Sequence, residues 1–162
     1  IEDVEDIAHI SVLHDIGKIN IPDGLLNKRG KYTQKEYEII KEHTVSGASF
    51  LKKLHEETGS RFLLLGYEMA IGHHERWDGG GYPQGLKAGK IPLSARIMAF
   101  ADAYDAILSR RPYKDPLPAP HAEAVLASEK GKQFDPLIVE AFERNRDAFL
   151  EIHNRYPDTD YY

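Results

Sequence analysis

The spacing of apolar residues constrains the fold of this chain more than any other feature of its sequence. After Thr33, side chains suited to a buried face recur at three- and four-residue intervals, at Tyr37, Ile40, Thr44 and Gly47. This is the period of an α-helix with one buried face. We find no convincing stretch of the two-residue alternation that marks a half-buried strand. The sequence therefore predicts an all-α fold, a compact bundle of about six helices with long functional loops.

Six helices are expected from this periodicity and from the residues that interrupt it. The first carries Val4, Ile7, Ala8 and Ser11 on one face and ends at Leu13-His14-Asp15. The second opens at Thr33 and runs past Leu51, and the third runs from about Arg61 to Arg76. The fourth opens at Ser94 and reaches Leu108, the fifth lies near His121 to Lys130, and the sixth lies near Pro136 to His153. Gly and Pro mark the connections at 16–32, 78–92 and 112–120 as loops.

Three of these helices have predicted caps. Thr33 and Glu36 have the spacing of a capping box. Asp135 is expected to cap the last helix with Pro136 at its first position. Ser94 is expected to cap the helix that contains Asp102.

Composition narrows the class of protein. A length of 162 residues with 41% hydrophobic residues suits one domain with a real core. A net charge of −5 argues against a nonspecific binder of nucleic-acid polymers but allows a small anionic substrate. The absence of cysteine removes disulfides, zinc–thiolate sites and Cys nucleophiles, and fits a cytoplasmic protein. No apolar run approaches the ~20 residues that cross a bilayer, and the acidic N-terminus does not resemble a targeting peptide.

Histidines and aspartates at particular places predict a metal site. Taken alone, His43 reads more readily as a satisfied buried histidine. Asp102 could equally be half of an ion pair and His14-Asp15 an ordinary polar helix end, and a pair such as His73-His74 also occurs in exposed loops. Together they place metal-binding groups on several helices facing one centre. Imidazole mixed with carboxylate, without thiolate, favours iron or manganese in a polynuclear site, with nickel or zinc as alternatives. The candidate ligands are His14, Asp15, His43, His73, His74 and Asp102.

Two basic segments could bind phosphate. Lys18 lies three residues after Asp15, where it could touch a phosphoryl oxygen. Arg110-Arg111-Pro112-Tyr113-Lys114 follows the helix of Asp102 and could form a second anion grip. Each could instead be a solvated basic turn.

The order of these motifs resembles the HD-GYP domain, a bacterial branch of the HD phosphohydrolase superfamily. Agreement runs from about Leu13 to Phe142. The motifs that carry it are His14-Asp15-Ile16-Gly17-Lys18, His43, His73-His74-Glu75-Arg76-Trp77-Asp78-Gly79, Gly81-Tyr82-Pro83 and Arg111-Pro112-Tyr113-Lys114. The resemblance implies an HD-domain-like helical bundle over 1–162 around two or three divalent metal ions. Members of the family usually have a further helix with a His ligand before this point, and an upstream receiver or sensor domain. We expect both to be missing here, and His9 is too near His14 to replace that ligand.

The resemblance also implies roles for individual residues. Asp15 would bridge two metals and, with Lys18, act in catalysis. The phosphates of the substrate would contact Lys18, Arg111 and Lys114. Tyr82, in the Gly81-Tyr82-Pro83 loop, would shape the edge of the pocket, and this loop would offer a contact surface to GGDEF-type diguanylate cyclases. Among the metal ligands, His43, His73 and His74 would hold the second metal, and His14 and Asp102 the first.

The expected function is metal-dependent hydrolysis of cyclic di-GMP to linear pGpG, GMP or both. The expected reaction is in-line attack of hydroxide on phosphorus, which needs no side-chain nucleophile. Two rivals remain: an HD phosphohydrolase that acts on another nucleotide, and a catalytically weak signalling module that binds cyclic di-GMP.

Overall fold

The computed structural model describes residues 2–109 and 117–156. These residues form eight α-helices, three short 3-10 helices at Ser11–Leu13, Ile16–Asn20 and Ala88–Lys90, and a single β-bridge between Lys130 and Phe134. The prediction of an all-α fold is confirmed. The α-helices are α1 (Glu2–Ile10), α2 (Asp23–Leu26), α3 (Gln34–Thr58), α4 (Arg61–Gly72), α5 (Leu93–Leu108), α6 (Ala119–Ser128), α7 (Pro136–Arg144) and α8 (Arg146–Arg155).

Two helices more than expected appear in these residues. One is the single turn of α2, inside a connection predicted as a loop. The other arises because the helix predicted from Pro136 to His153 is broken at Asn145 into α7 and α8. The Asn145 side-chain amide donates to Ala141 O at 2.7 Å, and its backbone N–H donates to Phe142 O at 2.8 Å. These bonds satisfy carbonyls at the end of α7 and let the chain turn before α8.

The predicted caps of α3 and α7 are confirmed. Thr33 and Glu36 form both bonds of a capping box, and Asp135 Oδ1 accepts from Leu137 N at 2.9 Å. The predicted cap of α5 is wrong. Pro92 occupies the cap position, and Ser94 lies inside the first turn with its hydroxyl 3.4 Å from Glu68 Oε2. The fixed φ of proline starts the helix here without a side-chain cap.

The predicted end of α4 is also wrong, and the error bears on the site. We predicted a helix to Arg76, but α4 ends at Gly72, so His73 and His74 lie in the turn beyond it. Trp77 N and Asp78 N donate to the carbonyls of Gln133 and Lys132 at 3.0 and 2.8 Å. These bonds to a distant turn hold the chain away from the helix axis.

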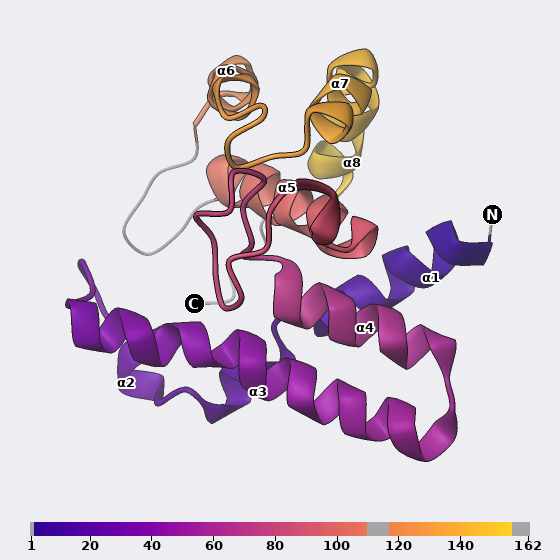
Figure 1. The fold of residues 1–162 in the computed structure, drawn as a ribbon. Helices are drawn as coiled ribbons and strands as arrows, with labels where there is room; N and C mark the ends of the chain where they lie inside the picture. The colour runs from indigo at the N-terminus through magenta and orange to yellow at the C-terminus, as the bar shows by residue number, and fades with distance from the viewer. Residues whose placement is uncertain (1, 110–116, 157–162) are drawn as a thin grey trace.

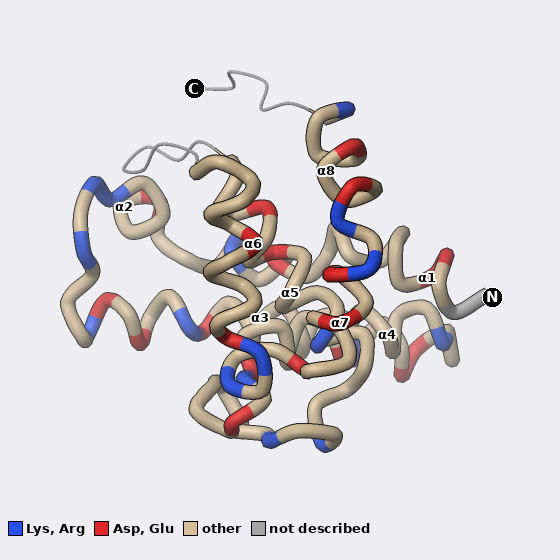
Figure 2. Tube along the Cα trace, turned by 90° about the horizontal axis from the view of Figure 1, so that it is seen from above, with Lys and Arg blue, Asp and Glu red and all other residues tan. Residues whose placement is uncertain are grey.

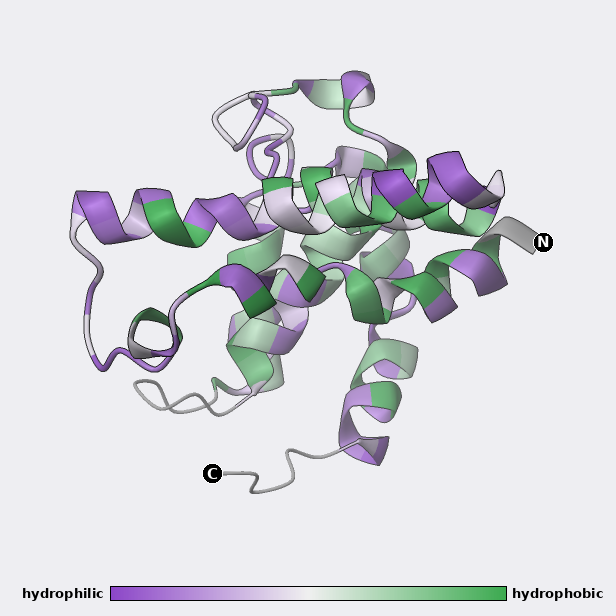
Figure 3. Ribbon diagram, turned by 90° about the horizontal axis from the view of Figure 1, so that it is seen from below, coloured by the Kyte–Doolittle hydropathy of each residue, from purple (hydrophilic) through white to green (hydrophobic). Residues whose placement is uncertain are grey.

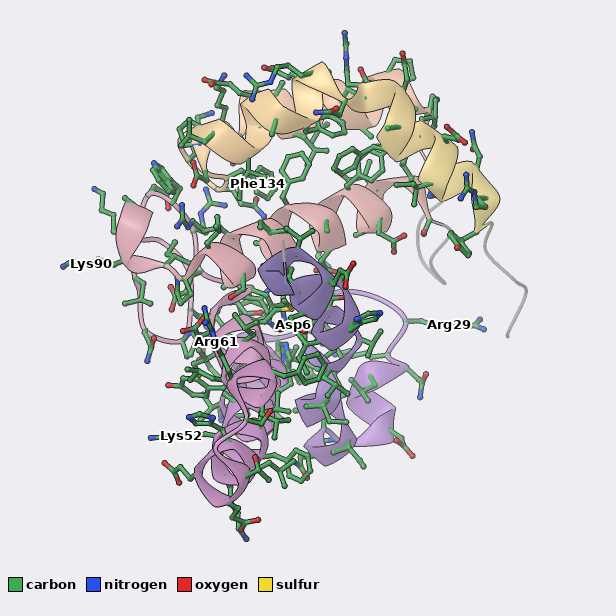
Figure 4. All side chains as sticks on the ribbon, turned by 90° about the vertical axis from the view of Figure 1, so that its right-hand side faces the viewer. Asp6, Arg29, Lys52, Arg61, Lys90 and Phe134 are labelled. Carbon is green, nitrogen blue, oxygen red and sulfur yellow. The ribbon has the colours of Figure 1, made fainter. Side chains whose placement is uncertain are left out.

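The helices pack in two groups with α5 between them. Figure 1 shows α1 to α4 on one side of α5 and α6, α7 and α8 on the other. One hydrophobic cluster joins α5 to the C-terminal helices, and Phe134 lies between them in Figure 4. A smaller cluster around Ala48, Leu51 and Ala70 joins α3 to α4. The Tyr82 loop between α4 and α5 descends toward α3 in Figure 1.

The surface of the described residues is mixed in character. Acidic and basic residues are interspersed along the trace in Figure 2. Hydrophobic and hydrophilic stretches alternate along α3 in Figure 3, as expected of a helix with one buried face. Within the described residues, no helix has the length and the hydrophobicity needed to cross a membrane.

Candidate metal centre

A very close approach of two backbones brings His14 and Asp15 to α3. Gly17 packs against α3 at Gly47, and a Cβ on Gly17 would lie 2.0 Å from His43 O and 2.6 Å from Gly47 N. Only a residue without a side chain allows this contact. His14 and Asp15 therefore stand directly beside His43.

The other two histidines reach the same point from the end of α4. Gly72 lies against α5, where an added Cβ would meet Ala95 Cβ at 2.8 Å. His73 is the C-cap residue of α4, and His74 follows it in the turn beyond the helix. On a continued helix adjacent side chains would point about 100° apart. In the observed turn their ring centroids are 4.1 Å apart, so both serve one site.

Three of the imidazoles are oriented by backbone carbonyls. Nδ1 of His14 lies 2.7 Å from Ser11 O, and Nδ1 of His43 lies 2.6 Å from Ile40 O. Nδ1 of His73 lies 3.1 Å from the carbonyls of both Met69 and Ala70. A carbonyl can only accept, so Nδ1 carries the proton in each ring. Such bonds fix the tautomer of metal-binding histidines and turn Nε2 toward the ion.

The Nε2 atoms of His43 and His73 and the Oδ1 atom of Asp15 point toward one another, and no proton is available to join them by hydrogen bonds. The Nε2 atoms of His43 and His73 are 3.3 Å apart, and Asp15 Oδ1 lies 3.3 and 3.7 Å from them. With Nδ1 protonated, neither neutral ring can donate from Nε2. Asp15 Oδ1 is buried and has no hydrogen-bond partner. Lone pairs and a carboxylate oxygen this close repel each other unless a cation lies among them.

Two sets of three potential ligand atoms result, and they share His73. One set is His43, His73 and His74, and the other is His14, Asp15 and His73. The atoms of each set lie within 4.8 Å of one another. Nitrogen and carboxylate oxygen are the donors that divalent transition metals accept. The residues present therefore fit a divalent metal.

The protonation states suit this reading. Burial and the nearby rings of His73 and His43 lower the pKa of His74 to about 2, so it is neutral at pH 7. Burial likewise lowers the pKa of His43. Burial alone would raise the pKa of Asp15, but its contacts with His14, His73 and Lys18 hold it well below its usual range. His43 and His74 are therefore neutral imidazoles beside an ionised carboxylate.

Asp15 uses its two oxygens differently. Oδ2 receives the ion pair of Lys18 and lies 3.2 Å from His14 Nε2. Burial alone would lower the pKa of His14, but the hydrogen bond and charge of Asp15 raise it overall. Oδ1 is left facing His43 and His73. Lys18 is about half exposed, so its amine stands at the rim of the site.

Asp102 lies near the site but outside both ligand sets. Its charge raises the pKa of His14 and of Tyr82, which places the α5 carboxylate within electrostatic reach of the centre. Arg111 and Lys114, which are predicted to bind a second phosphate, lie outside the described residues.

Tyr82 closes one side of the centre. Its ring stacks on His74 at a centroid distance of 4.8 Å and meets the edge of Tyr37 at 6.1 Å. Burial raises the pKa of the Tyr82 phenol far above its usual range, and Tyr37 raises it further. Tyr82 is therefore a neutral ring that covers His74.

Sequence reasoning did not find the residue that anchors this loop. Glu75 is 3% exposed, and its carboxylate accepts the backbone N–H groups of Gln84 at 2.7 Å and Leu86 at 2.9 Å. At Gly81, a Cβ would lie 2.4 Å from Arg76 N, so the loop lies on the Glu75 backbone itself. A carboxylate between a histidine pair and a glycine-rich loop was the available signal.

Several known phosphodiesterases are similar to this chain in sequence. A cyclic di-GMP phosphodiesterase of Thermotoga maritima is 46% identical over 97% of this chain and 42% of its own length. A probable cyclic di-GMP phosphodiesterase of Vibrio cholerae is 44% identical over 90% of this chain and 34% of its own. A 3′3′-cGAMP-specific phosphodiesterase of Vibrio cholerae is 39% identical over 94% and 28%. The chain thus spans less than half the length of these relatives.

The family follows from a match that covers most of the chain. The model of the HD domain matches residues 2–138, which include the histidines and aspartates of both ligand sets. The family predicted from the order of the motifs is confirmed. This chain belongs to the HD domain family.

Proposed function

We propose that this chain is the catalytic part of a metal-dependent phosphodiesterase that hydrolyses cyclic di-GMP to pGpG, to GMP or to both. One observation carries the proposal: an ionised, unpartnered oxygen of Asp15 faces the Nε2 atoms of His43 and His73. The substrate class is supported by relatives named cyclic di-GMP phosphodiesterases, which are 43–46% identical.

The proposed cofactor is two or three divalent ions, iron or manganese, with nickel or zinc as the other candidates. Bound ions of this kind lower the pKa of water to supply a hydroxide and neutralise phosphodiester oxygens. The proposed ligands are His14, Asp15, His43, His73, His74 and Asp102. The backbone bonds of three of these rings hold them ready, so little side-chain freedom is lost on binding.

The residues around the centre have proposed roles in binding and orientation. Lys18 would turn its exposed amine to a phosphoryl oxygen while remaining near Asp15. Tyr82 would exclude water from His74. Arg111 and Lys114 would hold a second phosphate, a role that rests on the sequence alone.

Turnover by the purified chain tests the proposal. We expect cyclic di-GMP to be hydrolysed after loading with Mn2+ or, without oxygen, Fe2+, and to persist with a chelator. Chromatography identifies the products. Binding of cyclic di-GMP without turnover under every metal would favour the signalling-module reading. If the chain neither binds nor hydrolyses cyclic di-GMP, the proposal is refuted.

A second candidate substrate is cyclic GMP-AMP. A relative 39% identical over 94% of this chain is named a 3′3′-cGAMP-specific phosphodiesterase. The two substrates differ in one base, so the metal centre does not separate them. Side-by-side values of kcat/KM decide between them, and we expect the larger value for cyclic di-GMP.

A partner is also proposed for the Gly81-Tyr82-Pro83 loop. Tyr82 turns inward to His74, whereas Pro83, Gln84 and Gly85 are exposed. The exposed part of the loop would contact a GGDEF-type diguanylate cyclase. Cross-linking from Gln84→Cys to such a domain tests this contact.

A further inference from the structure

A cavity of about 660 Å³ opens at the start of α3, outside both ligand sets. It is lined by Gly30, Lys31, Tyr32, Thr33, Gln34 and Tyr37. Its volume lies within the ~300–1,000 Å³ typical of small-molecule sites. Nothing described so far gives this cavity a role.

Two half-exposed tyrosines form its walls. Tyr32 is 37% exposed and Tyr37 39%. The Tyr32 hydroxyl donates to Leu25 O at 3.1 Å, which fixes that ring against α2. On α3, Lys41 Nζ lies 5.4 Å from the centre of the Tyr37 ring while paired with Glu38 at 2.6 Å. The rings are thus held in place, yet keep part of their surface open to a ligand.

The cavity is connected to the metal centre through aromatic contacts. Tyr37 lines the cavity and meets Tyr82 at a centroid distance of 6.1 Å, and Tyr82 stacks on His74 at 4.8 Å. A ligand in the cavity that contacts Tyr37 is therefore separated from Tyr82, the ring that stacks on His74, only by the Tyr37 ring.

The lining chemistry favours a flat, uncharged group. Lys31 is its single cationic side chain, beside two aromatic rings and the small or polar residues Gly30, Thr33 and Gln34. A phosphate would be poorly neutralised by one lysine, whereas a nucleobase has two faces that stack on aromatic rings and edges that accept polar contacts.

We propose that this cavity is a nucleobase subsite, in which one base of a cyclic dinucleotide stacks on Tyr37 beside Tyr32. The inference rests on the proposed function, because it takes its ligand from it. A base held at Tyr37 leaves the adjoining ribose and phosphate on the Tyr82 side, toward His74. The subsite would contribute affinity and orientation, and the metal centre the chemistry.

The test compares Tyr37→Ala and Tyr32→Ala with Tyr37→Phe, which keeps the ring, and with Tyr156→Ala, which removes a tyrosine 73% exposed at the end of α8. Three measurements are made on each protein: calorimetric affinity for cyclic di-GMP, KM for its hydrolysis, and the metal-dependent rate on bis(p-nitrophenyl) phosphate, a phosphodiester without a nucleobase. The last rate reports on the metal centre alone. Tyr32 is bonded to Leu25 and provides a variant away from Tyr82.

We expect Tyr37→Ala and Tyr32→Ala to weaken affinity and raise KM about tenfold, the scale of one base–aromatic stack. The Tyr37→Phe and Tyr156→Ala variants should stay within about twofold, and the bis(p-nitrophenyl) phosphate rate should not change in Tyr32→Ala. Unchanged affinity in both alanine variants would overturn the subsite and leave the proposed function standing. A wild-type chain that binds cyclic di-GMP but hydrolyses neither phosphodiester would overturn the proposed function, while calorimetry would still decide the subsite.

Discussion

His43 shows how one side chain is prepared to bind a metal. It is 1% exposed, its Nδ1 is committed to Ile40 O at 2.6 Å, and its Nε2 faces Asp15 Oδ1 at 3.3 Å. Each contact alone is ordinary for a buried histidine. Their combination leaves an imidazole lone pair beside a carboxylate oxygen, an arrangement that a cation stabilises. His73 shows the same pattern, so two imidazole nitrogens and one carboxylate oxygen together favour a cation at this point.

Replacement of His43 should therefore remove metal. In His43→Ala we expect the affinity for the metal held by His43, His73 and His74 to fall at least ~10-fold, so that less metal stays bound at equal free metal, because losing even a supporting partner of a ligand costs ~10–100-fold in affinity. The matched control is His9→Ala, which removes an exposed histidine of α1. Elemental analysis of both purified variants measures the change. Equal metal in the two would mean that His43 is an ordinary buried histidine.

Lys18 should contribute to turnover without contributing to metal binding. Lys18→Ala removes a charged donor, a loss of ~1.5–3 kcal/mol, so kcat/KM for cyclic di-GMP should fall roughly 10–100-fold. Metal content should not fall, because Asp15 loses a competing cation. Lys52→Ala, on the exposed side of α3, serves as the control. A kcat/KM equal to wild type would return Lys18 to the role of a solvated lysine.

At the scale of elements, short contacts between backbones decide where the ligands stand. Gly17 against α3, and Gly81 against the backbone of Glu75, leave no room for a side chain. Glu75 then fixes the loop through two backbone amides. These contacts bring the His14-Asp15 turn, α3 and the turn after α4 together in one site.

Gly17→Ala should disrupt the approach of the His14-Asp15 turn to α3. Its Cβ would meet backbone atoms at 2.0 and 2.6 Å, which cannot move as a flexible side chain does. We expect a loss of at least ~1–3 kcal/mol in the free energy of unfolding, together with lower metal content. Gly24→Ala is the control, since nothing lies within 4 Å of its added Cβ. Urea denaturation of both variants checks the difference, and equal midpoints would contradict it.

Glu75→Gln should loosen the loop that carries Tyr82. One of the two acceptor oxygens becomes an NH2 group, which leaves a partly buried amide N–H without its partner at a cost of ~1 kcal/mol. We expect faster hydrogen exchange at Gln84 and Leu86 than in wild type. In Glu57→Gln, a replacement on the exposed face of α3, these amides should exchange as in wild type. Protected amides in Glu75→Gln would show that other contacts hold the loop.

At the scale of the whole molecule, the metal centre and the larger core occupy different places. The aromatic cluster of Phe100, Tyr104 and Phe142 lies between α5 and the C-terminal helices. The ligand sets come from the α1–α3 side and from the end of α4. An ion pair of Arg96 with Asp135 connects α5 to the start of α7, and the bonds of residues 77 and 78 to 132 and 133 connect the loop after α4 to the turn between α6 and α7. Metal binding would therefore stabilise the part of the molecule that has the smaller hydrophobic cluster.

Removal of metal should lower the thermal stability of the whole chain. A ligand at 100 times its Kd stabilises the folded state by about 2.7 kcal/mol. For a domain of this size that corresponds to a fall in Tm of roughly 5–10 °C on chelation. Scanning calorimetry of the metal-loaded chain with and without chelator measures it. His43→Ala should respond much less, and an equal response in both proteins would assign the chelator effect to another site.

The sequence by itself determined the helical class and the caps at Thr33 and Asp135, and it predicted the histidines and aspartates that a metal site would draw on. These features depend on periodicity and on local hydrogen bonds between neighbours in the chain, which sequence displays directly. The family also followed from the order of the motifs, because that order combines many independent positions.

Only the tertiary structure decided how those residues meet. The chain leaves the axis of α4 after Gly72, and residues 77 and 78 bond to a turn more than 50 residues away, a contact that no local pattern displays. The break at Asn145, the hydroxyl of Ser94 turned to Glu68, and the anchoring by Glu75 likewise depend on the local geometry or the partners that the folded chain supplies. The unpartnered oxygen of Asp15 is the clearest case, since it exists only where Gly17 and Gly47 let two backbones touch.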